Sequence, residues 1–107
     1  MIELNKDNFK KEISGLILVF FWSPTCGACN SCFPLTKELS KQGINVGMVN
    51  IFENYEIVKE YKIPATPTII IFKNGIAIER AVGLRSKEVL IQKMNSCISS
   101  NTFWTLM

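Results

Sequence analysis

The sequence contains no histidine and no cluster of basic residues. Histidine is the commonest metal ligand in proteins, so its absence weakens any interpretation of the chain as a metal-binding module. The net charge is +3, from 12 basic and 9 acidic side chains spread over 107 residues. Because no basic patch stands out, we do not expect nucleic acid to be a partner.

The sequence also lacks a long apolar run and a basic-then-apolar N-terminus. Its longest apolar run is Leu16–Trp22, far short of the roughly 20 residues that span a bilayer. Residues 1–7 carry no signal-peptide pattern. We therefore expect no membrane association and a cytoplasmic location, where structural disulfides are rare.

Charged residues are missing between Glu12 and Lys37, and this stretch contains Cys26-Gly27-Ala28-Cys29. The apolar run before it predicts a strand, and a strand followed by Cys-x-x-Cys at the start of a helix is typical of a redox site. At a helix N-terminus, unpaired N–H groups and the helix dipole favour a thiolate, which is the reactive form. With no charge nearby in sequence, backbone N–H groups are the expected source of that stabilisation at Cys26.

Hydrophobic periodicity predicts alternating strands and helices with a hairpin near the end. The expected strands are residues 2–4, Leu16–Trp22, residues 44–51, Thr68–Lys73 and Ile76–Val82. The expected helices are residues 7–13, 26–41 with a kink at Pro34, 53–61, and a last helix capped by Ser86. This order predicts an α/β fold with a central mixed sheet of about five strands flanked by about four helices.

The last two strands are joined by Asn74-Gly75, a strong hairpin signal. The final helix presents an apolar face, which we expect to include Leu90, Met94, Cys97 and Ile98. We see no linker, so we expect one domain over residues 1–107, with 99–107 as a possible C-terminal tail. Phe103 and Trp104 in that tail are expected to contribute packing or, alternatively, a weak interaction surface.

In order, these motifs resemble the thioredoxin family over residues 2–98. The matching features are Trp22, Cys26-Gly27-Ala28-Cys29, Pro34, Ile63-Pro64-Ala65-Thr66-Pro67-Thr68, Phe72-Lys73-Asn74-Gly75 and Gly83. The resemblance implies a thioredoxin fold and a protein-disulfide reductase. It also implies a cis bond at Pro67.

The resemblance assigns roles to the site residues. It implies that Cys26 attacks a substrate disulfide and that Cys29, lying deeper, resolves the mixed disulfide, so that the two form a redox-active pair. It implies a substrate groove made by Trp22, Thr25, Gly27, Ala28, Thr66, Pro67 and Gly83. A monomer without bound cofactor or metal is expected, acting on disulfide-containing client proteins. A thioredoxin reductase, linked to NADPH and flavin or to ferredoxin, would supply its reducing equivalents.

Four residues depart from the family pattern. Thr25 replaces a tryptophan before the first cysteine, and Ala28 replaces the proline between the cysteines. Phe20 stands where the family has a buried aspartate that assists the resolving cysteine, and Met48 stands where a lysine lies near it. Replacing both members of a buried ion pair is physically reasonable, because removing only one would leave an unpaired charge in the core. We expect slower resolution of mixed disulfides as a result.

Other interpretations stay open at this point. The chain is alternatively a specialised oxidant, isomerase or client-specific redox partner, or a non-catalytic thioredoxin-fold binding module. Cys32 extends the pattern to Cys-x-x-Cys-x-x-Cys, which in iron–sulfur proteins needs a fourth ligand. We expect Cys32 and Cys97 to be structural, although an accessory or regulatory thiol at position 32 is the alternative.

Overall fold

One mixed five-stranded sheet organises the computed structural model, which describes the backbone of residues 1–106 and the side chains of residues 1–98. The strands are β1 (Ile2–Glu3), β2 (Leu16–Trp22), β3 (Val46–Asn50), β4 (Thr68–Lys73) and β5 (Ile76–Val82). Their order is β1-β3-β2-β4-β5, parallel across β1, β3 and β2 and antiparallel from β2 through β4 to β5. The predicted mixed sheet is confirmed.

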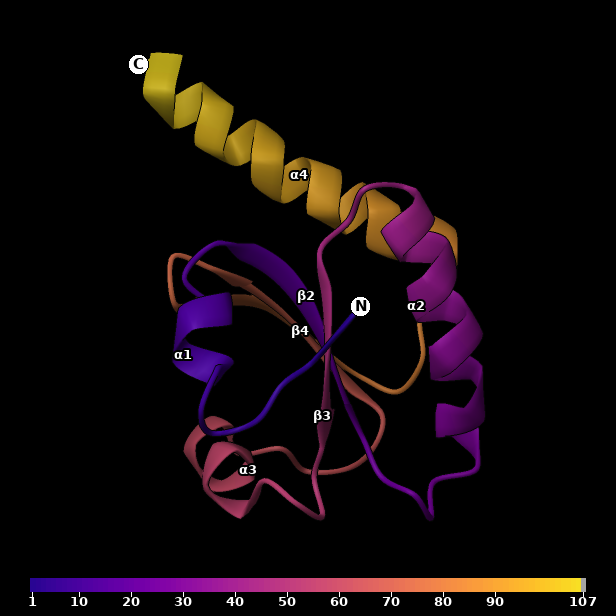
Figure 1. Ribbon diagram of the computed structural model, residues 1–107. Helices are drawn as coiled ribbons and strands as arrows, with labels where there is room; N and C mark the ends of the chain where they lie inside the picture. Colours follow the sequence, from indigo (N-terminus) through magenta and orange to yellow (C-terminus); the bar gives the residue numbers. More distant parts are fainter. Residues whose placement is uncertain (107) are drawn as a thin grey trace.

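The helices are α1 (Phe9–Glu12), α2 (Cys32–Lys41), α3 (Tyr55–Tyr61) and α4 (Lys87–Leu106), with a short 3-10 helix η1 (Ala28–Ser31) before α2. Figure 1 shows α1 and α3 on one side of the sheet and α2 on the other, with the start of α4 beside α2. None of the helices within the described residues is long and apolar enough to cross a membrane.

β2 lies at the centre of the sheet and is buried on both faces, because neighbouring side chains along a strand point to opposite sides. The face toward α2 and α4 forms what we call the cysteine core. Its buried members are Leu18, Phe20, Cys29, Cys32, Leu39, Val46, Met48, Ile69, Ile71, Leu90, Met94 and Cys97. The opposite face forms the aromatic core, made by Leu4, Phe9, Ile13, Ile17, Val19, Phe21, Val49, Ile57, Ile70 and Phe72.

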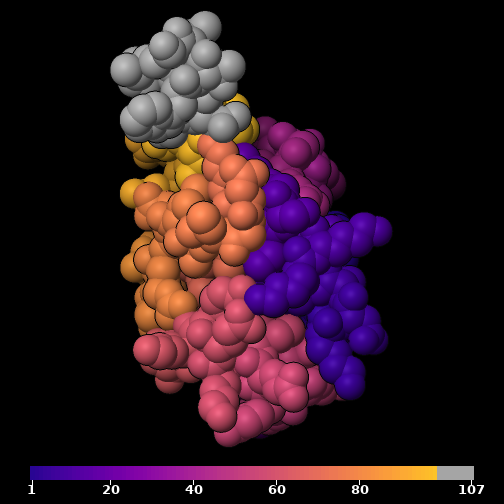
Figure 2. All heavy atoms as spheres, turned by 90° about the vertical axis from the view of Figure 1, so that its left-hand side faces the viewer, coloured from indigo at the N-terminus to yellow at the C-terminus, as the bar shows by residue number. Residues whose placement is uncertain are grey.

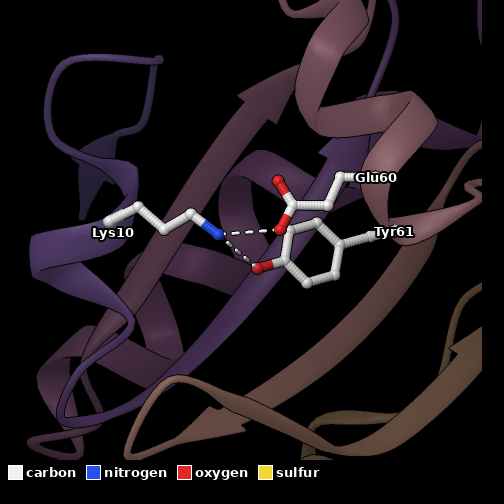
Figure 3. Close-up of polar contacts among 3 residues, drawn as sticks. All are labelled: Lys10, Glu60 and Tyr61. Atoms are coloured by element: carbon white, nitrogen blue, oxygen red, sulfur yellow. Dashed lines mark hydrogen bonds and ion pairs between the residues drawn. The ribbon is translucent and has the colours of Figure 1, made fainter.

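Surface contacts link α1 to α3 over the aromatic core. Figure 2 looks onto this side and shows α1, α3 and the orange chain around β5 at the surface. Lys10 Nζ lies 2.7 Å from Glu60 Oε2 and 3.4 Å from the Tyr61 hydroxyl, as drawn in Figure 3. Both members of the ion pair are more than half exposed, so it adds little to the stability supplied by the rings beneath.

The predicted hairpin turn at Asn74-Gly75 and the predicted helix cap at Ser86 are confirmed. Asn74 and Gly75 have φ of 55° and 83°, and two positive values at the centre of a two-residue turn match the twist of a β-hairpin. Ser86 Oγ accepts the Val89 N–H at 3.2 Å, which makes Ser86 the N-cap of α4. Gly43 follows α2 with φ of 81°, a conformation that favours glycine after a helix.

Two predictions about helices need correction. Residues 26–41 do not form one helix, because η1 precedes α2 and Pro34 lies in the first turn of α2, where proline is tolerated. Ile98 is 51% exposed, whereas Leu90, Met94 and Cys97 are buried as predicted. α4 extends to Leu106, while the predicted packing of Phe103 and Trp104 falls on side chains outside the described residues.

Candidate functional site

The sulfurs of Cys26 and Cys29 are bonded to each other, with 5.3 Å between their Cα atoms. Cys26 lies in the turn between β2 and η1, and Cys29 lies within η1. Backbone hydrogen bonds hold this turn: the Cys26 N–H donates to Ser23 O and the Cys29 N–H to Cys26 O, both at 3.2 Å. Cys26 is partly exposed, whereas Cys29 is 1% exposed. The pair therefore presents one sulfur to solvent and one to the core.

A proline loop flanks the disulfide, and its Thr66–Pro67 peptide bond is cis as the resemblance implies. Pro67 is buried at the start of β4. The Gly83 N–H donates to Pro67 O at 2.7 Å, which brings the end of β5 against this loop. Gly83 has φ of +92°, a left-handed conformation that a side chain disfavours. The structure thus places Pro67 and Gly83 together.

A cluster of hydroxyl groups joins the cysteine turn to the proline loop. Ser23 is 5% exposed, and its Oγ lies 3.5 Å from both Thr25 Oγ1 and Thr66 Oγ1. These distances are long for hydrogen bonds between hydroxyl groups, so we describe Ser23, Thr25 and Thr66 as a packed polar cluster. Sequence reasoning placed Thr66 in the substrate groove but missed Ser23. No local pattern relates residues 43 positions apart.

The other predicted groove residues lie around the turn. Trp22 ends β2, is half-buried, and packs edge-on against Phe33 with 5.2 Å between the ring centres. Thr25, Gly27 and Ala28 are exposed. Among the described residues, no hydrogen bond joins Gly27 or Ala28 to the proline loop, whereas Thr25 is linked to Thr66 through Ser23.

The surroundings of Cys29 are apolar. Phe20 and Met48 are partners in the parallel register of β2 and β3, with 0% and 3% exposure, and belong to the same core as Cys29. Over the side chains that the structure describes, the buried polar residues are Ser23, Thr36, Asn50 and Thr68. None of these titrates near neutral pH, so no buried carboxylate or amine accompanies Cys29.

The two remaining cysteines, Cys32 and Cys97, are free and buried. Burial raises the pKa of the Cys32 thiol from 9.0 to about 11. Burial also raises the pKa of Cys97, and the negative charge of Glu79 adds to that effect. Both side chains are therefore neutral thiols at pH 7. Within residues 1–98, no group of three or more histidine, cysteine, aspartate or glutamate side chains is placed to hold a metal ion.

Comparisons with known proteins agree with this geometry. The Thioredoxin family model matches residues 1–96. A thioredoxin of Rickettsia felis is 40% identical over 97 residues, covering 85% of this chain and 92% of that protein. A thioredoxin of Chlamydia pneumoniae is 36% identical over 95 residues, covering 86% and 93%. A solved mutant thioredoxin from Halobacterium salinarum superposes with a TM-score of 0.83 at 23% identity, covering 89% and 88%.

The solved structure establishes the fold, and the family match together with the relatives extends this to chemistry. Thioredoxins work through their own thiols without a bound cofactor, and their partners are a reductase and disulfide-bearing clients. The chain therefore belongs to the thioredoxin family and is a thiol–disulfide oxidoreductase that reduces protein disulfides through Cys26 and Cys29.

Proposed function

We propose that Cys26 is the attacking thiol and Cys29 the resolving thiol of this reductase. The observation that carries the assignment is the difference in exposure, since Cys26 is partly exposed and Cys29 is 1% exposed. A protein disulfide reaches the first sulfur without any rearrangement of the core. The second sulfur is shielded from other disulfides but stays within bonding reach of the first.

The reaction proceeds in two exchanges. The Cys26 thiolate attacks one sulfur of the client disulfide, the client S–S bond breaks, and the leaving thiolate takes up a proton. Cys29 then loses its proton and attacks the Cys26 sulfur, which forms the Cys26–Cys29 bond and releases the second client thiolate. Two electrons pass to the client, and the protein is left with the disulfide present in this structure.

We infer that the client segment lies in a groove between the cysteine turn and the proline loop. Its proposed lining is Trp22, Thr25, Gly27, Ala28, Thr66, Pro67 and Gly83. Pro67 has no N–H, and an extended client strand would pair with the backbone of Thr66. The hydrogen bond between Gly83 and Pro67 supports this arrangement, because it fixes the two flanking segments to each other.

We further propose that the chain acts as a single-domain monomer in the cytoplasm. A thioredoxin reductase, either a flavin enzyme fed by NADPH or a ferredoxin-linked one, would return two electrons and two protons to the disulfide after each cycle. Family membership supports this general scheme.

Trapping tests the assignment of the two thiols. Incubation of Cys29→Ser with a disulfide-linked peptide should accumulate a mixed disulfide on Cys26, because the resolving thiol is missing. Cys26→Ser should accumulate none, and Cys97→Ser, a matched change of a buried thiol in α4, should turn over normally. Mass spectrometry of the intact protein measures the adduct. An adduct on Cys29 in the Cys26→Ser protein, with none in Cys29→Ser, contradicts the proposal.

A further inference from the structure

A concavity lies on the cysteine-core side of the sheet, between β4, β5 and α4. It has a volume of about 230 Å³. We call it the Arg85 groove. Its floor is apolar, because Ile69, Ile71 and Leu90 reach it with only 2–3% of each residue exposed. Ala81 and Val89 add apolar surface to the lining. A ligand with an aliphatic group would therefore bury that group against these side chains.

Arg85 is the cationic residue of the groove whose N–H donors are only partly used. Its Nη1 donates to the carbonyls of Val82 at 3.2 Å and Leu84 at 3.0 Å, which fixes the guanidinium. Within the side chains described, we find no partner for its other nitrogens. A guanidinium presents five N–H groups in a planar fork that matches a carboxylate. Arg85 is therefore oriented by the backbone and has donors left for an anion.

The other charged residues of the groove are already engaged. Lys93 Nζ lies 3.7 Å from Glu79 Oε1, so these two charges largely offset each other. The guanidinium of Arg80 donates to the carbonyls of Tyr61 and Lys62 at the end of α3, on the opposite side of the sheet. The net charge left at the groove is positive and is centred on Arg85.

Two residues, Gly83 and Leu84, connect Arg85 to the proline loop and to the core beneath Cys26. Gly83, two residues before Arg85, donates its N–H to Pro67 O at 2.7 Å. Leu84, between them, packs against the same core as Cys26. A polypeptide lying along the proline loop would therefore pass Gly83 and Leu84 and meet Arg85 next.

We propose that the Arg85 groove binds an acidic segment of the protein substrate. An aspartate or glutamate near the client disulfide pairs with the Arg85 guanidinium, and a neighbouring aliphatic side chain packs on Ile69, Ile71 and Leu90. A basic segment is disfavoured, because Arg85 repels it and the nearby carboxylate of Glu79 is already paired with Lys93. This inference rests on the proposed function, since it names the class of client for the same disulfide site.

The test compares two disulfide-linked peptides that differ only in Glu-Leu or Gln-Leu beside one cysteine. Reduction by pre-reduced protein should have a second-order rate constant about 5-fold higher for the Glu-Leu peptide, near the upper range for an exposed ion pair. Arg85→Gln should abolish the preference, and added salt should reduce it in the wild type. Lys11→Gln is the matched control, because it removes one positive charge from α1 on the opposite face.

A disulfide-free Glu-Leu peptide provides a readout that needs no redox chemistry. It should shift the amide NMR signals of Ala81, Arg85 and Val89 in the wild type and not in Arg85→Gln. The proposal is overturned if Arg85→Gln keeps both the kinetic preference and these shifts, or if Lys11→Gln loses the preference equally. Failure of the wild type to reduce bis(2-hydroxyethyl) disulfide, with the peptide shifts intact, would instead contradict the thiol assignments and leave the groove supported.

Discussion

The two faces of the sheet differ in what they bury. The core beneath α2 and α4 holds Cys29, Cys32 and Cys97, with Cys26 packed against it. The opposite core contains no cysteine among its described members and is built around phenylalanine rings. All four cysteines therefore lie on one side of a sheet whose two faces are both covered by helices.

The aromatic core is held by ring contacts between distant segments. Phe72 packs edge-on against Phe9 and Tyr61, with ring centres 5.6 and 5.2 Å apart, and Phe9 also meets Tyr61 at 5.4 Å. These rings connect β4, α1 and α3. We infer a division of labour between the two faces, in which the aromatic core stabilises the fold and the cysteine core holds the reactive thiols.

The largest expected effect is a loss of stability without a loss of chemistry. Phe72 is fully buried, so Phe72→Ala removes a ring from the aromatic core and leaves a cavity. We expect the free energy of unfolding to fall by about 3–5 kcal/mol, measured by urea denaturation. The fraction that remains folded should reduce the disulfide of insulin at the wild-type rate.

Phe72→Leu is the matched control for this experiment, because it keeps an apolar side chain and should cost less. A folded Phe72→Ala protein with a greatly reduced turnover would contradict the division of labour. It would show that the aromatic face also tunes the disulfide site.

The second expected effect is on rate and concerns the cysteine core. Phe20→Asp combined with Met48→Lys would place a carboxylate and an ammonium group at paired positions of β2 and β3, in the core that contains Cys29. A local base would speed deprotonation of Cys29, the proposed resolving thiol. We expect resolution to accelerate roughly 10²-fold, at the low end of general base catalysis, and stability to fall because two charges are buried. Stopped-flow tryptophan fluorescence measures the step.

Phe20→Asn with Met48→Gln is the control for this pair, since it matches the shapes and supplies no base. If the charged pair resolves mixed disulfides no faster than the wild type at any pH, the absence of a buried carboxylate does not limit this protein.

The sequence predicts only part of this arrangement of two cores and a disulfide site. β4 and β5 have the predicted bounds, because Asn74-Gly75 determines the turn and the turn determines the hairpin register. The spacing of Cys26 and Cys29 predicts a redox pair, and the family resemblance implies the cis bond at Pro67. Whether the first turn after Cys26 is 3-10 or α-helical depends on tertiary contacts that periodicity does not report. Sequence reasoning missed the polar cluster of Ser23, Thr25 and Thr66 for the same reason, because Ser23 and Thr66 are 43 positions apart in the sequence.

The smallest effect tests whether the third thiol of the cysteine core is chemically silent. Burial raises the pKa of Cys32 from 9.0 to about 11, so the folded state keeps this proton where the unfolded chain has lost it. The stabilisation is complete below the unfolded pKa and is lost as pH rises from about 9 to about 11. Wild-type stability should fall more steeply over this window than that of Cys32→Ala. Chemical denaturation of both proteins across the window measures the difference. Equal slopes would mean that Cys32 titrates normally in the folded protein, and it would then be a third thiol, beside Cys26 and Cys29, able to take part in exchange.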